Sequence, residues 1–144
     1  MQQAYNLYIT ALKHQRVTSV VLLLMWMGVI FYFSSLPQPV SHLEWSFELL
    51  LRKLAHFFEY FVLCFLVFWV SVGRMRSRYA LVVSIVGACL YAISDEYHQS
   101  FVPGRHATLM DIGIDLFGIL TMGMLLYNDM LVTRARRVFS FLNY

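Results

Sequence analysis

The sequence is poor in charged residues and in cysteine. Only 13% of its 144 residues are Asp, Glu, Lys or Arg, and 60% are hydrophobic, whereas a soluble domain is about 25% charged. This balance argues against a water-soluble globular fold, and it excludes a disordered chain because the apolar surface is too large to stay in water. The two cysteines, Cys64 and Cys89, lie in apolar runs without metal-ligand spacing, so neither a disulfide framework nor a zinc site is expected. Lys and Arg gather on no solvated face, which argues against nucleic-acid binding.

Four apolar segments are long enough to cross a bilayer, which takes roughly 20 helical residues. They are residues 17–36, 54–73, 79–94 and 109–128. The first contains no charged residue, and its end lacks the small residues of a signal-peptidase site, so we do not expect a cleaved signal peptide. The sequence therefore predicts an all-α integral membrane protein built as a four-helix transmembrane bundle.

Basic residues are distributed unequally between the two sides of this bundle. Most of the Lys and Arg residues flank the side that carries both termini: Lys13, Arg16, Arg74, Arg76, Arg78, Arg134, Arg136 and Arg137. The opposite side carries only Arg52, Lys53 and Arg105. The positive-inside rule then predicts that both termini are cytoplasmic and that the loops at 37–53 and 95–108 face outward.

Three segments follow from this topology. Residues 1–16 form a cytoplasmic N-terminal segment at the membrane interface, and residues 17–131 form the four-span membrane domain. Residues 132–144 form a basic cytoplasmic tail. Because basic and apolar residues alternate in this tail, we expect a short helix that lies on the inner headgroups.

Three of the predicted helices carry polar side chains near their outer ends. These side chains are Lys53, His56, Glu59 and Tyr60 on the second span, Asp95, Glu96, His98 and Gln99 on the third, and Asp111 and Asp115 on the fourth. Spacings of three and four residues put most members of each group on one helix face. An ionisable side chain costs about 2.5–3.5 kcal/mol at mid-membrane and normally faces the bundle interior at a functional site. The pattern therefore predicts one polar site in the outer leaflet, formed by three helices.

The outer loop before the fourth span contains Pro103 and Gly104, a pair typical of a type II turn. Such a turn directs Arg105 back over the acidic side chains, where its guanidinium can bind a phosphate or neutralise the carboxylates. Asp111 also has two interpretations. It follows Thr108 at the spacing of a helix N-terminal cap, and it lies on the same helix face as the deeper acid.

The polar residues as a whole also have a structural interpretation. Asp95 and Glu96 can be solvated residues at a helix end. The complete set can be an ion-pair network around Arg105 that only holds the helices together. Glu59 and Asp115 fit that interpretation least well, because both lie within apolar runs.

The polar residues fall into three blocks of sequence. They read Lys53-x-x-His56-x-x-Glu59-Tyr60, Ser94-Asp95-Glu96-x-His98-Gln99-x-Phe101-x-Pro103-Gly104-Arg105 and Asp111-x-x-x-Asp115-x-x-Gly118. Over residues 17–130 these blocks resemble the VanZ-like family of small bacterial membrane proteins, and the second block is the most specific. The pair at 106–107 is His-Ala, where the family more often has a small hydroxyl-bearing pair.

The resemblance implies a multi-pass protein of the bacterial plasma membrane with a role in the cell envelope. Members of the family are associated with low-level resistance to the glycopeptide antibiotic teicoplanin, and similar domains accompany genes for envelope polysaccharides. The resemblance implies no particular reaction. It does imply that the partners are membrane lipids and a lipid-linked envelope precursor.

The first interpretation of the residues is an enzyme that acts on a lipid phosphate or glycan by hydrolysis or transfer. Catalytic roles are then expected for His56, Glu59, Asp95, Glu96, His98 and Asp115, and substrate contacts for Lys53, Tyr60, Gln99 and Arg105. One divalent cation can be held through carboxylate oxygens of Glu59, Asp95, Asp111 and Asp115. Either His56 or His98 is the general base. The chain has neither a G-x-S-x-G nor an H-E-x-x-H motif, so the residues indicate a polar site rather than a named reaction.

Two other interpretations belong to different classes of protein. A non-catalytic binder would recognise the headgroup of a lipid or cell-wall precursor, or shield it from a glycopeptide. A transporter or flippase is less favoured, because such proteins place their sites near the midplane between repeats and broken helices. The predicted site lies near one surface, and the sequence contains no repeat. The oligomeric state does not follow from the sequence.

Overall fold

The computed structural model describes residues 2–37, 47–105 and 108–142. In that part the chain forms α1 (Gln2–Ser34), α2 (Phe47–Val72), α3 (Ser77–Gln99) and α4 (Leu109–Leu142). Each helix contains a segment long and apolar enough to span a membrane: Gln15–Ser34, Leu49–Val72, Ser77–Gln99 and Leu109–Thr133. The chain is therefore all-helical with four candidate membrane spans, as the sequence predicts.

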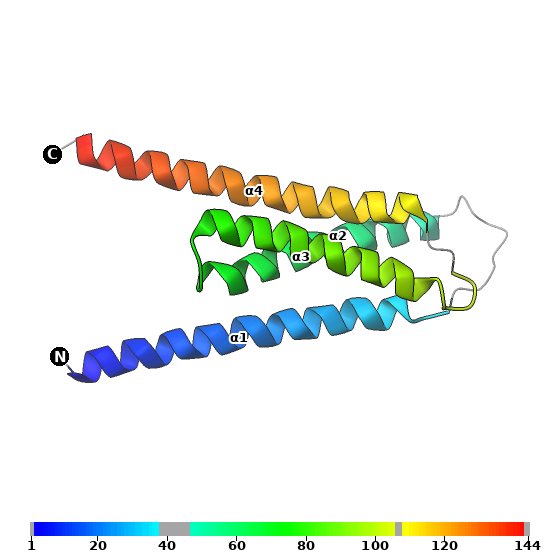
Figure 1. The fold of residues 1–144 in the computed structure, drawn as a ribbon, viewed down its shortest axis with the longest axis horizontal. Coiled ribbons are helices and arrows are strands. Elements are labelled where there is room, and N and C mark those ends of the chain that lie inside the picture. Colours follow the sequence, from blue (N-terminus) through cyan, green and yellow to red (C-terminus); the bar gives the residue numbers. More distant parts are fainter. Residues whose placement is uncertain (1, 38–46, 106–107, 143–144) are drawn as a thin grey trace.

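Helix α2 lies at the centre of the bundle. It packs against each of the other three helices, and α3 also packs against α4, whereas α1 contacts only α2 and α3 within the described residues. Figure 1 shows α1 and α4 on opposite sides of the bundle, with α2 and α3 between them. The start of α1 and the end of α4 lie at the same end of the bundle as the short α2–α3 connection, and the end of α1, the start of α2, the end of α3 and the start of α4 lie at the opposite end (Figure 1). We call the latter the loop end.

Small residues allow the central helices to pack closely. Ala80, Ser84, Ala88 and Ala92 follow each other at intervals of four along α3, and all four are buried. In membrane proteins small residues of this kind let helix backbones approach one another. The larger buried residues Tyr60, Leu63 and Cys64 of α2, Ile119 of α4 and Ile30 of α1 complete the core.

Helix α1 is attached to the rest of the bundle by two hydrogen bonds from aromatic side chains to main-chain carbonyls. The indole N–H of Trp26 donates to the carbonyl of Glu59 in α2 (2.9 Å), and the hydroxyl of Tyr91 in α3 donates to the carbonyl of Met27 (2.8 Å). Trp and Tyr that are partly buried usually find such partners. These bonds fix the position of α1 next to α2 and α3 although few of its own side chains are buried.

The connection between α3 and α4 has the turn and the cap that the sequence predicts. The amide of Arg105 donates to the carbonyl of Val102 (3.1 Å), and Gly104 has a φ of 78°, which together define a type II turn. At the start of α4 the amide of Asp111 donates to the hydroxyl oxygen of Thr108 (3.1 Å). Thr108 is therefore the N-cap residue of α4.

The helices are longer than the predicted spans. The predicted interfacial segment continues into α1 without a break, and α4 runs on to Leu142 in one direction instead of turning into a separate surface helix (Figure 1). Neither helix contains a proline, so nothing in the backbone stops it at the membrane surface. Helix α3 likewise extends to Gln99, so the polar residues from 95 onward lie within a helix and not beyond its end. Residues 38–46 of the first predicted outer loop, and His106 and Ala107, lie outside the described residues.

Candidate functional site

A buried imidazole–carboxylate pair joins α2 to α4. Nδ1 of His56 lies 3.1 Å from Oδ1 of Asp115, and the two residues are 8% and 0% exposed. One turn beyond Asp115, Gly118 lies against the main chain of α2, where a Cβ atom would overlap the carbonyl oxygen of Phe57. The absence of a side chain at Gly118 therefore lets the two helices approach closely enough for the pair to form.

Glu96 of α3 adds a second carboxylate to this pair. It is 3% exposed, and within the described residues neither of its carboxylate oxygens has a hydrogen-bond partner. Oδ2 of Asp115 is also buried without a partner. One ligand atom from each of His56, Glu96 and Asp115 lies within 4.8 Å of the other two. We call these three residues the buried triad; each comes from a different helix.

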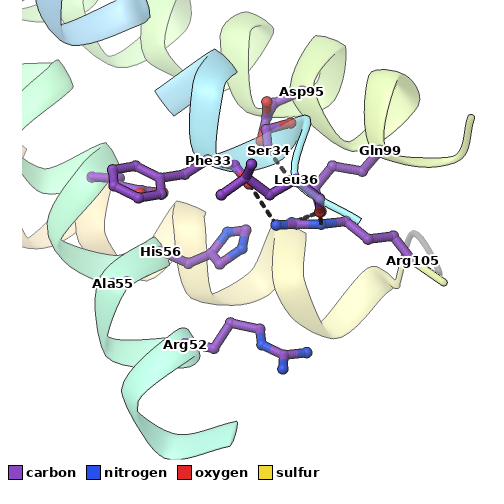
Figure 2. A pocket seen from close by; sticks show the side chains of 10 residues that line it. Phe33, Ser34, Leu36, Arg52, Ala55, His56, Asp95, Gln99 and Arg105 are labelled. Atoms are coloured by element: carbon purple, nitrogen blue, oxygen red, sulfur yellow. Dashed lines mark hydrogen bonds between the residues drawn. The ribbon is translucent and has the colours of Figure 1, made fainter. Parts of the chain in front are cut away.

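A cavity of about 250 Å³ lies at the loop end of the bundle, beside the triad. Its polar walls are formed by Arg52, His56, Glu59, Asp95, Gln99 and Arg105, and its apolar walls by Phe33, Leu36 and Ala55. Figure 2 shows the side chains of Arg52, His56 and Arg105 facing one common space. His56 thus belongs both to the cavity and to the buried triad.

Arg105 connects the last turn of α1 with α3. Its Nε donates to the carbonyl of Leu36 (3.1 Å), its Nη2 to the carbonyl of Phe33 (2.6 Å), and its Nη1 to Oε1 of Gln99 (2.9 Å). Nε2 of Gln99 then donates to Oδ2 of Asp95 (2.7 Å). The carbonyls at a helix C-terminus lack partners within the helix and carry partial negative charge, so a guanidinium stabilises them. Arg105 is therefore linked to the carboxylate of Asp95 through the side chain of Gln99.

Two guanidinium groups share this cavity. Burial and the positive charge of Arg52 lower the pKa of Arg105 from its ordinary value, while the acids Asp95, Glu59 and Glu96 act in the opposite direction. An arginine side chain nevertheless stays charged in a protein. The repulsion between the two groups means that an anion in the cavity would be stabilised by both.

Residues 19–133 match the family model described as VanZ/LLP1. The chain belongs to the VanZ/LLP1 family. No curated protein and no solved structure matches it. The matched region runs from α1 to the end of the membrane-spanning part of α4, so it contains the cavity and the buried triad. The family resemblance seen in the sequence is thus confirmed.

Seven of the predicted site residues of this VanZ-family chain fall into two adjoining groups. The cavity takes His56, Glu59, Asp95, Gln99 and Arg105. The buried triad takes His56, Glu96 and Asp115. The four predicted cation ligands do not form one group. Glu59 and Asp95 line the cavity, Asp115 belongs to the buried triad, and Asp111 pairs with Lys53 and Thr108. Glu96, which was not predicted as a ligand, joins Asp115 instead.

Lys53 of α2 pairs with Asp111 in the first turn of α4, and neither residue lines the cavity. Nζ of Lys53 is 3.3 Å from Oδ1 of Asp111, and both side chains are 24% exposed. Oδ2 of Asp111 accepts a hydrogen bond from the hydroxyl of Thr108 (2.6 Å). Of its two interpretations, Asp111 is therefore observed as part of the helix cap.

His98 and Tyr60 also lie apart from the cavity. Nε2 of His98 is 3.0 Å from the hydroxyl oxygen of Ser35, and its ring stacks on Phe31 with 4.6 Å between ring centroids. His98 is thus directed toward α1. Tyr60 is fully buried in the core, and its hydroxyl has no hydrogen-bond partner among the described residues.

Sequence reasoning missed Arg52 and the main-chain carbonyls at the end of α1. Arg52 precedes His56 by four residues, so helical spacing alone would have put both on one face of α2. The carbonyls of Phe33 and Leu36 give no signal in the sequence, because every residue has a carbonyl. The first span contains no ionisable residue, and for that reason it was not expected to border the site.

Proposed function

We propose that this VanZ-family protein acts on the phosphate-bearing headgroup of a lipid-linked cell-wall or polysaccharide precursor at the outer face of the bacterial plasma membrane. One observation carries the proposal: an imidazole held by a buried carboxylate, His56 with Asp115, borders the same cavity as the guanidiniums of Arg52 and Arg105. Guanidinium groups bind phosphate oxygens through parallel hydrogen bonds. A positioned imidazole is the commonest proton carrier in catalysis.

The proposed orientation is supported by the distribution of basic residues. The basic α2–α3 connection, with Arg74 and Arg76, lies at the end of the bundle where α1 begins and α4 ends (Figure 1), whereas the residues that line the cavity lie at the loop end. Basic loops are retained in the cytoplasm, which favours cytoplasmic termini and an outward-facing cavity. A precursor in the outer leaflet can then keep its lipid chain in the bilayer while its phosphate enters beside Phe33 and Leu36.

Hydrolysis of a phosphate ester fits the groups in the cavity. Water attacks phosphorus and gives its proton to Nε2 of His56, the bond from phosphorus to the leaving oxygen breaks, and the carboxyl of Glu59 protonates that oxygen. Asp115 accepts the Nδ1 hydrogen bond and so holds the ring in this tautomer. Arg52 and Arg105 stabilise the charge on the non-bridging oxygens. Transfer follows the same course with an acceptor hydroxyl in place of water.

A second candidate function is binding of the same headgroup without reaction. The observation that favours it is the state of Arg105, which already donates three of its five N–H groups to Phe33, Leu36 and Gln99. A cavity held in this way can recognise a headgroup without moving. Shielding of a cell-wall precursor would also give a route to teicoplanin resistance.

Turnover by the purified protein distinguishes the two functions. The full chain in nanodiscs is incubated with a short-chain polyprenyl diphosphate and, separately, with lipids extracted from bacteria, and products and released phosphate are measured by mass spectrometry and colorimetry. We expect turnover that falls by about 10²–10⁴-fold in His56→Gln, the range for a general acid–base group. Arg52→Gln should raise KM, and Arg78→Gln, an exposed arginine in the first turn of α3 at the other end of the bundle, is the matched control.

The remaining outcomes also decide between the candidates. Retention of unaltered lipid by the wild-type protein, lost in Arg52→Gln but not in Arg78→Gln, would favour the binder. Glu59→Gln and Asp115→Asn should stay inserted and folded while turnover is lost. If both variants fail to accumulate in the membrane, the polar residues serve to hold the helices together. If the wild-type protein neither retains nor changes any lipid, the proposal is wrong.

A further inference from the structure

The buried triad has the composition of a metal site. We infer that His56, Glu96 and Asp115 bind one divalent transition-metal cation, such as Zn²⁺ or Mn²⁺, between α2, α3 and α4. This inference is independent of the proposed reaction, because the binding of a cation can be measured without any substrate.

The first argument is the unsatisfied state of the carboxylates. Both oxygens of Glu96 and Oδ2 of Asp115 are buried, and in the described part of the chain none makes a hydrogen bond of ordinary geometry; the main-chain N–H of Thr108 is the one donor that acts on Glu96, and it is not within that geometry. Burying a polar group without a partner is costly, and buried charges in proteins are usually paired or coordinate a metal. The ammonium of Lys53 pairs with Asp111 and not with the triad. A cation in the triad would satisfy the unpartnered oxygens.

The second argument is the geometry of the ligand atoms. One ligand atom from each of His56, Glu96 and Asp115 lies within 4.8 Å of the other two, and Nδ1 of His56 is 3.1 Å from Oδ1 of Asp115. Two atoms that are each about 2.1 Å from one ion are separated by roughly 3.0–4.2 Å, depending on the angle between them. The triad therefore reaches coordination distances through side-chain shifts of a few tenths of an ångström.

The third argument is the rigidity of the helices that carry the ligands. Gly118 fixes the contact between α4 and α2, and Ala92, one turn before Glu96, is fully buried in the core. Each ligand thus stands on a packed helix and not on a loop, which is the arrangement that holds a metal site to its geometry. Because His56 also lines the cavity, a cation can enter from the loop end.

The donor atoms indicate which cation is favoured. One imidazole nitrogen and two carboxylates suit Zn²⁺ or Mn²⁺, whereas Ca²⁺ and Mg²⁺ prefer oxygen ligands alone. Three protein ligands leave a coordination position for water or for a substrate oxygen, as in catalytic metal sites. The cation would occupy the position between His56 and Asp115 that the shared proton otherwise takes.

The metal content of the purified protein tests the inference. The full chain in nanodiscs is loaded with Zn²⁺ or Mn²⁺, freed of excess metal and measured by inductively coupled plasma mass spectrometry. We expect about one ion per chain, and a Kd at least about tenfold weaker in Glu96→Gln and in Asp115→Asn. Asp111→Asn is the matched control, because it removes a carboxylate one turn away on α4 that belongs to the cap.

A second measurement covers the case in which the triad variants do not fold. X-ray absorption at the zinc edge of the wild-type protein should show one nitrogen and at least two oxygen donors and no sulfur, although the chain contains Cys64 and Cys89. A wild-type protein that retains neither metal overturns the inference. So does retention at the wild-type level in folded Glu96→Gln and Asp115→Asn, or an equal loss in Asp111→Asn. These measurements use no substrate. A protein that binds no metal would therefore overturn this inference without deciding the proposed function, which the turnover experiment tests.

Discussion

Gly118 of α4 lies directly against the main chain of Phe57 in α2. A Cβ atom at Gly118 would be 3.2 Å from the amide nitrogen of Phe61 and would overlap the carbonyl oxygen of Phe57. His56 immediately precedes Phe57, and Asp115 lies one turn before Gly118. The backbone contact therefore sets the separation of the imidazole and the carboxylate on which the proposed function depends.

Replacing Gly118 by alanine should separate α2 and α4. We expect Gly118→Ala to lower the free energy of unfolding by about 1–3 kcal/mol, since an added methyl group in a packed interface forces backbone shifts. The measurement is reversible unfolding in mixed micelles. Gly113→Ala is the control on the same helix, because a Cβ there meets nothing within 4 Å and alanine favours the helix. Equal stabilities of the two variants would show that the contact imposes no constraint.

Removing the guanidinium of Arg105 should loosen the end of α1. In Arg105→Gln the carbonyl of Leu36 loses the donor Nε, and the carbonyl of Phe33 keeps only the amide of Leu36 (3.3 Å); at about 0.5–1.5 kcal/mol for each lost bond, the end of α1 should open more often. Hydrogen exchange of the amides of Ser35 and Leu36 should accelerate by about fivefold or more. Arg105→Lys keeps the positive charge but lacks the several N–H donors of a guanidinium, so hydrogen exchange should accelerate in this variant as well. Exchange at the wild-type rate in both variants would contradict this role.

The N-cap of α4 should matter more than the ion pair beside it. We expect Thr108→Ala to lower the free energy of unfolding by about 1 kcal/mol, as for other N-caps. Lys53→Met should cost less than about 1 kcal/mol, because the pair with Asp111 is partly exposed to solvent. Unfolding of the two single variants gives the comparison. The reverse order would mean that Lys53 and Asp111 form a central ion pair of the site.

The orientation can be tested with single cysteines. In a chain with Cys64→Ala and Cys89→Ala, Ser100→Cys at the loop end should react with a membrane-impermeant maleimide in intact cells. Arg76→Cys, at the opposite end, should react only after the cells are opened. Both positions are exposed in the structure. The inverse labelling pattern would put the cavity on the cytoplasmic side.

Features that depend on local sequence were predictable. The four spans follow from length and hydrophobicity, the type II turn follows from Pro103 and Gly104, and the N-cap follows from Thr108. Each of these is decided within a few neighbouring residues or one helix. The family assignment was also available, because its residues recur at fixed spacing within short blocks.

Membership of the buried triad could not be predicted in this way. Spacing gives the height of a residue on its own helix but not the rotation of that helix relative to its neighbours. Asp95 and Glu96 are adjacent in the chain, and a helix turns by about 100° between them. Only the packing of α3 decides that Glu96 joins His56 and Asp115 while Asp95 binds Gln99. For the same reason, spacing did not indicate that the ring of His98 faces Phe31 of α1 and Ser35 just after it.

Helix α1 contributes no ionisable side chain to the cavity, yet the carbonyls of its last turn hold Arg105, and the indole of Trp26 binds the carbonyl of Glu59. One side of this charged cavity is thus formed by a helix that brings no charged residue to it. Exchanging one aliphatic side chain for another along α1 would tilt this helix and so widen or narrow the entrance of the cavity beside Phe33 and Leu36. Under the proposed function, selectivity for headgroup size can accordingly evolve in a span whose predicted range, residues 17–36, contains no charged residue.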